Sequence, residues 1–132
     1  MNIKLTSTAG DLGYQGESNK GFHQNFSGTG EACSPMESLL MAAAACSSID
    51  IEIILKKMRQ ELTSLEVDVQ AERREDISPA KFTSIHLDYT LHGNIKNEKA
   101  EKAVDMSLEK MCSVTHSLDP SIKITSSFKV VS

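Results

Sequence analysis

Hydrophobic and polar residues alternate along several stretches of the chain, a pattern that predicts β-strands with one solvent-exposed face. Within the first 30 residues, short alternating runs at 3–6 and 22–26 are separated by glycine-containing turns, which predicts a β-meander. Longer alternating stretches predict three further strands at 65–72, 85–92 and 122–130. The chain should therefore contain both a short N-terminal set of strands and a longer set that follows.

A different pattern begins at Ser34 and predicts a long helix that ends near Met58. Ser34 is a favourable N-cap and Pro35 a favourable first helical residue. Residues 36–55 are apolar nearly all round, so the helix should be buried on most sides. A chain of 132 residues would cover such a helix poorly alone, which favours a dimer that shares its burial.

A second helix is predicted to start at Asn97, a favourable N-cap. Its apolar residues form one stripe at helical spacing, which points Cys112 toward the core. The stripe consists of Ala100, Ala103, Val104, Leu108, Met111 and Cys112, together with Ser107. The order of strands, long helix, two strands, helix and strand predicts one α+β domain over residues 1–132, with a mainly antiparallel sheet.

Composition and charge narrow the classes of function. The net charge is −4 and the 14 Lys and Arg residues are scattered, so no nucleic-acid partner is expected. No signal peptide is visible, and the apolar run 39–46 is too short to cross a bilayer, so we expect a cytoplasmic protein without a membrane partner. The three cysteines form no CxxC pair, so neither a disulfide framework nor a metal site is expected.

Two segments resemble the OsmC/Ohr family. The first runs from Ser34 to Cys46 and combines a proline, an acidic residue, an alanine-rich turn and a cysteine, as the central helix of that family does. Its continuation through Arg59 looks most like the YhfA-like branch. The second, Glu109 to Val114, is similar to the family's second-cysteine segment, and the 66-residue separation of Cys46 and Cys112 also suits the family.

The resemblance implies both a fold and a chemistry. The fold is an intertwined homodimer, with antiparallel sheets packed on the long central helix and a second helix, and with sites at the subunit interface. In such proteins the first cysteine, here Cys46, attacks an organic or related hydroperoxide and becomes a sulfenic acid. The second, here Cys112, condenses with it to a disulfide, and a dithiol reductant, often lipoyl-linked, restores both thiols. No metal, flavin or other cofactor is needed.

The residues alone leave the role of the cysteines open. Periodicity places Cys46 and Cys112 on apolar helix faces, where buried cysteines commonly act as small hydrophobic residues. Two packed helices can also bring such residues to the Cβ separation of about 3.5–4.5 Å that a disulfide needs. The two family segments favour the redox pair. Cys33 matches neither family cysteine and is interpreted as an incidental loop thiol.

Three residues are candidates for a supporting role. Glu37 precedes Cys46 by nine positions, one fewer than the glutamate of Ohr-type proteins, and it could instead stabilise the helix dipole. Asp50 follows Cys46 by four positions, where an unpaired charge would disfavour the thiolate, or where it could satisfy backbone or interface donors. His116 follows Cys112 by four positions, where it could assist that thiol, or it could instead face solvent. No arginine precedes Arg59, so the Ohr-type Arg has no counterpart upstream.

Three hypotheses follow for the function. The first is a cysteine-based peroxidase that reduces organic hydroperoxides, with Cys46 attacking and Cys112 resolving. The second is a non-catalytic protein of the same fold that binds a small hydrophobic ligand at the dimer interface. The third is a thiol redox sensor with little turnover. The two family segments favour the first.

Overall fold

The computed structural model describes all 132 residues, which form two compact units, Met1–Met41 and Ala42–Ser132. In the first unit, three strands pair antiparallel in sequence order. The alternating runs at 3–6 and 22–26 predicted the first and third of them, whereas the second was not predicted as a strand. They are β1 (Ile3–Ser7), β2 (Gly13–Ser18) and β3 (His23–Ser27). Gly21, in the β2–β3 turn, has a φ of 89°, a conformation that glycine adopts without steric cost. The predicted N-terminal β-meander is therefore confirmed.

The long helix α1 (Pro35–Lys57) begins with a reciprocal cap. The backbone N–H of Glu37 donates to Ser34 Oγ at 3.1 Å, and the N–H of Ser34 donates to Glu37 Oε1 at 2.9 Å. This capping box satisfies two donors that the first turn leaves free. At the other end Arg59 has a φ of 58°, and the N–H of Gln60 donates to the carbonyl of Leu55 at 2.9 Å, which closes the last turn.

One side of α1 is buried within the chain and another is exposed. Its buried residues are Ala43, Ser47, Ile51, Ile54 and Leu55. Met41, Ile49 and Ile53 are large apolar residues that remain exposed. The expectation of burial on most sides is therefore not met by a single chain. By length and composition alone α1 could span a membrane, a property that core helices of other proteins share.

The second unit contains a three-stranded sheet in the order β4–β5–β6. Its strands are β4 (Glu61–Arg73), β5 (Phe82–Asn94) and β6 (Lys123–Val131). β4 and β5 form an antiparallel pair, whereas β6 runs parallel to β5 because the chain returns through helices before it enters the sheet. The predicted mainly antiparallel α+β fold holds, with this one parallel pairing.

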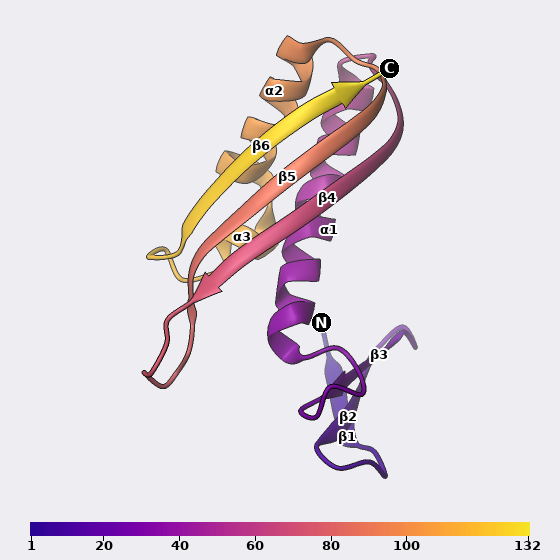
Figure 1. Cartoon of the computed structure of the whole chain (residues 1–132). Helices are drawn as coiled ribbons and strands as arrows, with labels where there is room; N and C mark the ends of the chain where they lie inside the picture. Colours follow the sequence, from indigo (N-terminus) through magenta and orange to yellow (C-terminus); the bar gives the residue numbers. More distant parts are fainter. The chain divides into compact units, whose positions relative to one another are not determined.

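Helices α1 and α2 cover the same face of the β4–β6 sheet (Figure 1). The central strand β5 supplies the apolar residues of that face, and the second helix adds small side chains. The fully buried residues on these elements include Ile85, Leu87, Tyr89, Leu91, Ala100, Ala103 and Val104. Side chains of the candidate functional site belong to this layer.

The segment between β5 and β6 consists of three helical pieces in succession. They are α2 (Asn97–Met106), the π-helical turn η1 (Ser107–Met111) and α3 (Ser113–His116). The N-cap of α2 is Lys96, one residue earlier than predicted, and the side chain of Gln60 accepts its backbone N–H at 2.9 Å. The predicted single helix is therefore interrupted before Cys112.

Candidate functional site

The second unit brings two sulfurs and one carboxylate together. One oxygen of Asp50 and the Sγ atoms of Cys46 and Cys112 all lie within 4.8 Å of one another. Cys46 and Asp50 are neighbours because residues four apart share a face of α1. Cys112 comes from a segment 66 positions further along the chain. All three cysteines are free thiols in this structure.

A π-helical turn sets the position of Cys112. The backbone N–H of Cys112 donates to the carbonyl of Ser107, five residues back, at 2.7 Å. Ser107 Oγ in turn donates to the carbonyl of Ser47 on α1 at 2.9 Å. The wider turn leaves Met111 39% exposed and Cys112 fully buried. The prediction that Met111 belongs to the inward stripe is therefore wrong, because a stripe drawn at 3.6 residues per turn ignores the π turn.

The surroundings of Cys112 favour its protonated thiol. Burial raises the pKa of the Cys112 thiol, and the neighbouring Cys46 adds to that effect. The backbone N–H of Thr115 donates to Cys112 Sγ at 3.5 Å and opposes the increase. Cys112 is the N-cap of α3, so its sulfur is held by the first turn of that short helix. Cys46 differs in being only partly buried.

A buried hydrogen-bond chain ties α1 to the sheet beside this cluster. The Tyr89 hydroxyl donates to Ser47 Oγ at 2.7 Å, and Ser47 Oγ donates to the carbonyl of Ala44 at 3.1 Å. Burial raises the pKa of Tyr89 to about 12; the bond to Ser47 partly offsets this and the nearby Cys112 adds to it. Neither Ser47 nor Tyr89 was predicted from the sequence to belong to the site. The available signal was a serine beside the cysteine in an apolar helix.

Asp50 has an unusual environment for a carboxylate. Its Oδ2 atom is inaccessible to solvent and has no hydrogen-bond partner, and no lysine, arginine or histidine forms an ion pair with it. A buried polar atom without a partner costs free energy, typically about 1–3 kcal/mol and more when charged. Within this chain the carboxylate therefore faces the two sulfurs without a compensating donor or cation.

The other predicted candidates have partners of their own. The hydrogen bonds with Ser34 hold the pKa of the exposed Glu37 below its usual value, in keeping with its place in the helix cap. His116 Nε2 lies 3.0 Å from the carbonyl oxygen of Leu108, and His116 is not part of the cluster. Cys33 precedes α1 in the first unit, and its carbonyl accepts the N–H of Ser27 at 3.1 Å.

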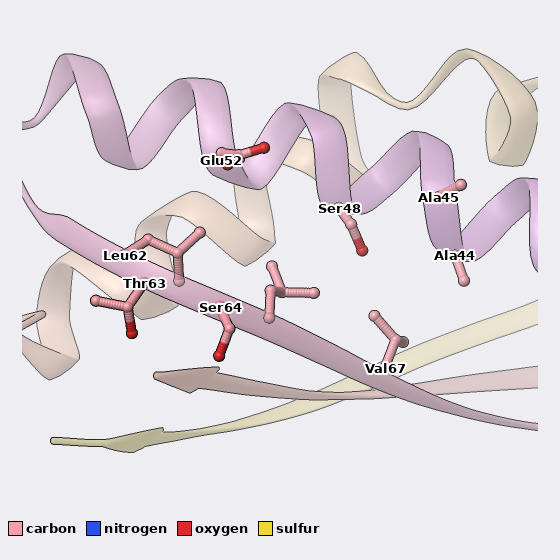
Figure 2. Close-up of a pocket in the computed structure, with 9 residues that line it drawn as sticks. Ala44, Ala45, Ser48, Glu52, Leu62, Thr63, Ser64 and Val67 are labelled. Carbon is pink, nitrogen blue, oxygen red and sulfur yellow. The ribbon is translucent and has the colours of Figure 1, made fainter. Parts of the chain in front are cut away.

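A groove of about 440 Å³ separates α1 from β4 (Figure 2). It is lined by Ala44, Ala45, Ser48, Glu52, Leu62, Thr63, Ser64, Leu65 and Val67. In Figure 2 the Ser48 hydroxyl points from the helix toward the strand. Neither Cys46 nor Cys112 lines the groove, so this feature is separate from the thiol pair.

Comparisons with known proteins agree with this architecture. The family model described as OsmC-like protein matches residues 28–127. Protein YhfA of Escherichia coli strain K12 is 42% identical over 123 residues, which are 91% of each chain. The crystal structure of a hypothetical protein from Aquifex aeolicus VF5 is similar to this structure, with a TM-score of 0.85 and 29% sequence identity. The similarity covers 99% of this chain and 97% of that protein. The organic hydroperoxide resistance protein OhrB of Bacillus subtilis shares the fold, with a TM-score of 0.65 and 19% identity over 98% of both chains.

Proposed function

We propose that this chain, which belongs to the family of OsmC-like proteins, reduces organic hydroperoxides with Cys46 and Cys112. One observation carries the proposal: two cysteines 66 positions apart in the sequence have their sulfurs within 4.8 Å of each other. Structural neighbours named for organic hydroperoxide resistance support the choice of substrate class. The redox sensor and the hydrophobic-ligand protein have no comparable observation in their favour.

The reaction uses both thiols and needs no further group. The Cys46 thiolate attacks one oxygen of the peroxide, the O–O bond breaks, and the alcohol leaves with a proton while Cys46 becomes a sulfenic acid. Cys112 then attacks the Cys46 sulfur, and water leaves with the Cys112 proton as the disulfide forms. One hydroperoxide and two thiols thus give one alcohol, one water and one disulfide. An external dithiol reduces that disulfide by thiol–disulfide exchange.

Burial supports this division of roles. Cys46 is partly buried and so remains reachable by a peroxide, whereas Cys112 is fully buried. The raised pKa of Cys112 keeps it as a thiol, which makes it a poor first nucleophile and leaves the first attack to Cys46. The Asp50 carboxylate has one oxygen beside both sulfurs and is the nearby acceptor for a thiol proton. Glu37 and His116, which are engaged by Ser34 and Leu108, are given no role in this mechanism.

Disulfide mapping tests the proposal directly. One equivalent of cumene hydroperoxide, added to the reduced protein, should produce a Cys46–Cys112 disulfide that mass spectrometry of peptides detects. Cys46→Ser should abolish this product, whereas Cys33→Ser, the matched control, should leave it unchanged. A protein that is inert to the peroxide, or that forms a stable sulfenic acid without the disulfide, would contradict the peroxidase mechanism. Lipid that copurifies with such an inert protein would support ligand binding.

We also propose that the working form is a cytoplasmic homodimer. Met41, Ile49 and Ile53 leave an apolar side of α1 exposed, and a second copy would bury it. Sedimentation at low micromolar concentration should give twice the 14.4 kDa mass of the chain. Ile49→Asp should shift the protein toward monomer because it places a charge on that side. Lys102→Glu, an equally exposed change on α2, should not, and a monomeric native protein would refute the dimer.

A further inference from the structure

The cluster that joins Cys46, Asp50 and Cys112 is also a set of metal ligands. Its three candidate ligand atoms, two sulfurs and one carboxylate oxygen, converge from two segments of the chain and lie within 4.8 Å of one another. Cys46 and Asp50 are spaced i and i+4 on α1, a spacing that directs two side chains to one point beside a helix. No metal site was expected from the sequence, because these ligands form no local cysteine motif.

The unpartnered oxygen of Asp50 is an independent observation that points to a cation. Asp50 Oδ2 is sealed from solvent, accepts no hydrogen bond and has no ion-pair partner in the chain. Buried charges in proteins are ordinarily paired or coordinate a metal. A cation bound between the carboxylate and the sulfurs would supply the missing partner.

The donor set selects the kind of cation. Two thiolates and one carboxylate suit Zn²⁺, whereas Mg²⁺ and Ca²⁺ prefer oxygen ligands alone. With Zn–S bonds of about 2.3 Å, a tetrahedral site places its sulfurs roughly 3.8 Å apart. The separation of the two sulfurs needs to shorten by at most about 1 Å to reach that geometry. Cys46 and Asp50 are only partly buried, which leaves a side for the ion to enter and for a water as fourth ligand.

We propose that the reduced protein binds one Zn²⁺ through Cys46 Sγ, Asp50 and Cys112 Sγ. The two thiol protons leave as the ion binds, so the bound site carries two thiolates, one carboxylate and a dipositive ion. Because the same sulfurs would form the disulfide, zinc binding and oxidation exclude each other. The metal therefore holds the thiol pair in its reduced form, and oxidation of the pair releases the metal. Binding itself requires no peroxide and goes beyond the proposed peroxidase function.

Competition with a chromogenic zinc chelator measures this binding on the full-length reduced protein. We expect one zinc per chain, with loss of the site in Cys46→Ser and Cys112→Ser. Asp50→Asn should weaken the affinity at least about tenfold, since the loss of even an outer-shell partner changes metal affinity by about 10–100-fold. Two matched controls should bind as the native protein does. They are Glu52→Gln, the same charge change at an exposed position of α1, and Cys33→Ser.

Cobalt provides a spectroscopic check of the same ligands. Co²⁺ added to the reduced protein should give thiolate-to-cobalt charge-transfer absorption and the intense visible bands of a tetrahedral site, and Zn²⁺ should displace it. Circular dichroism should show that each variant retains the native fold. Absence of stoichiometric binding, binding unchanged by Asp50→Asn, or loss of binding in Cys33→Ser would each overturn the zinc site. These results leave the peroxide assay unaffected, so failure of either proposal is distinguishable from failure of the other.

Discussion

Under the proposed mechanism, replacement of Cys112 by serine is expected to abolish recycling, so that Cys46 reacts once with peroxide and is then overoxidised. Cys46 is unchanged and can still attack the peroxide, but the resulting sulfenic acid has no neighbouring thiol with which to condense. Further peroxide then carries Cys46 to the sulfinic acid, which dithiols do not reverse. In a dithiol-coupled assay the variant should consume about two equivalents of peroxide per chain, one for the sulfenic acid and one for the sulfinic acid, and then stop. Mass spectrometry should then find two added oxygen atoms on Cys46.

The serine is a conservative probe because its small side chain replaces the small, fully buried side chain of Cys112. Its backbone N–H still bonds to Ser107, so the π turn should persist. Cys33→Ser is the control, since it removes one thiol without touching the pair, and it should sustain turnover. Sustained turnover by the Cys112→Ser protein would show that another group resolves the sulfenic acid and would exclude the role assigned to Cys112.

The free energy of unfolding should fall as the pH rises through the range from about 10 to about 12, because of Tyr89. Its pKa, about 12 in the folded protein because of burial, compares with 10.0 for an unperturbed tyrosine. Below pH 10 the hydroxyl is neutral in both states. Between the two pKa values the unfolded chain releases the proton while the folded chain keeps it, which favours unfolding. Two pKa units correspond to roughly 2–3 kcal/mol.

Urea unfolding of the reduced protein at about pH 8 and about pH 11 measures this effect. Tyr89→Phe should lose roughly 1 kcal/mol at the lower pH, from the hydrogen bond to Ser47, and should lose the Tyr89 part of the alkaline dependence. Tyr14→Phe, a matched change at an exposed tyrosine, should retain the full dependence. Equal alkaline losses in the two variants would show that burial of Tyr89 does not govern this range.

Local patterns in the sequence predicted most elements of the fold, but not β2 or the π turn η1. Ser34 and Pro35 located the start of α1 because capping and the proline constraint act within one turn. Alternation along β4, β5 and β6 identified the strands because one face of β5 is buried and one face of β4 and of β6 is less exposed than the other. The parallel placement of β6 beside β5 depended on how the chain crosses the sheet, which no local pattern specifies.

The candidate site, too, was predicted from the sequence only in part. Resemblance to a family selected Cys46 and Cys112, and a helical stripe correctly pointed Cys112 inward. The same stripe placed Met111 inward, because regular helical spacing cannot reveal a π turn held by the bond from Ser107 to α1. Ser47 and Tyr89 were missed because their hydrogen bond joins residues 42 positions apart.

The sequence by itself determined where most helices and strands form and which of their faces turn inward, since those properties depend on neighbours within a turn or on alternate positions. Only the tertiary structure decided that one carboxylate oxygen of Asp50 lies within 4.8 Å of two sulfurs, and that its Oδ2 atom is left without a hydrogen-bond donor. The physical reason is that such contacts depend on packing between segments distant in the chain, where a displacement of an ångström or an extra residue in one turn changes which atoms meet.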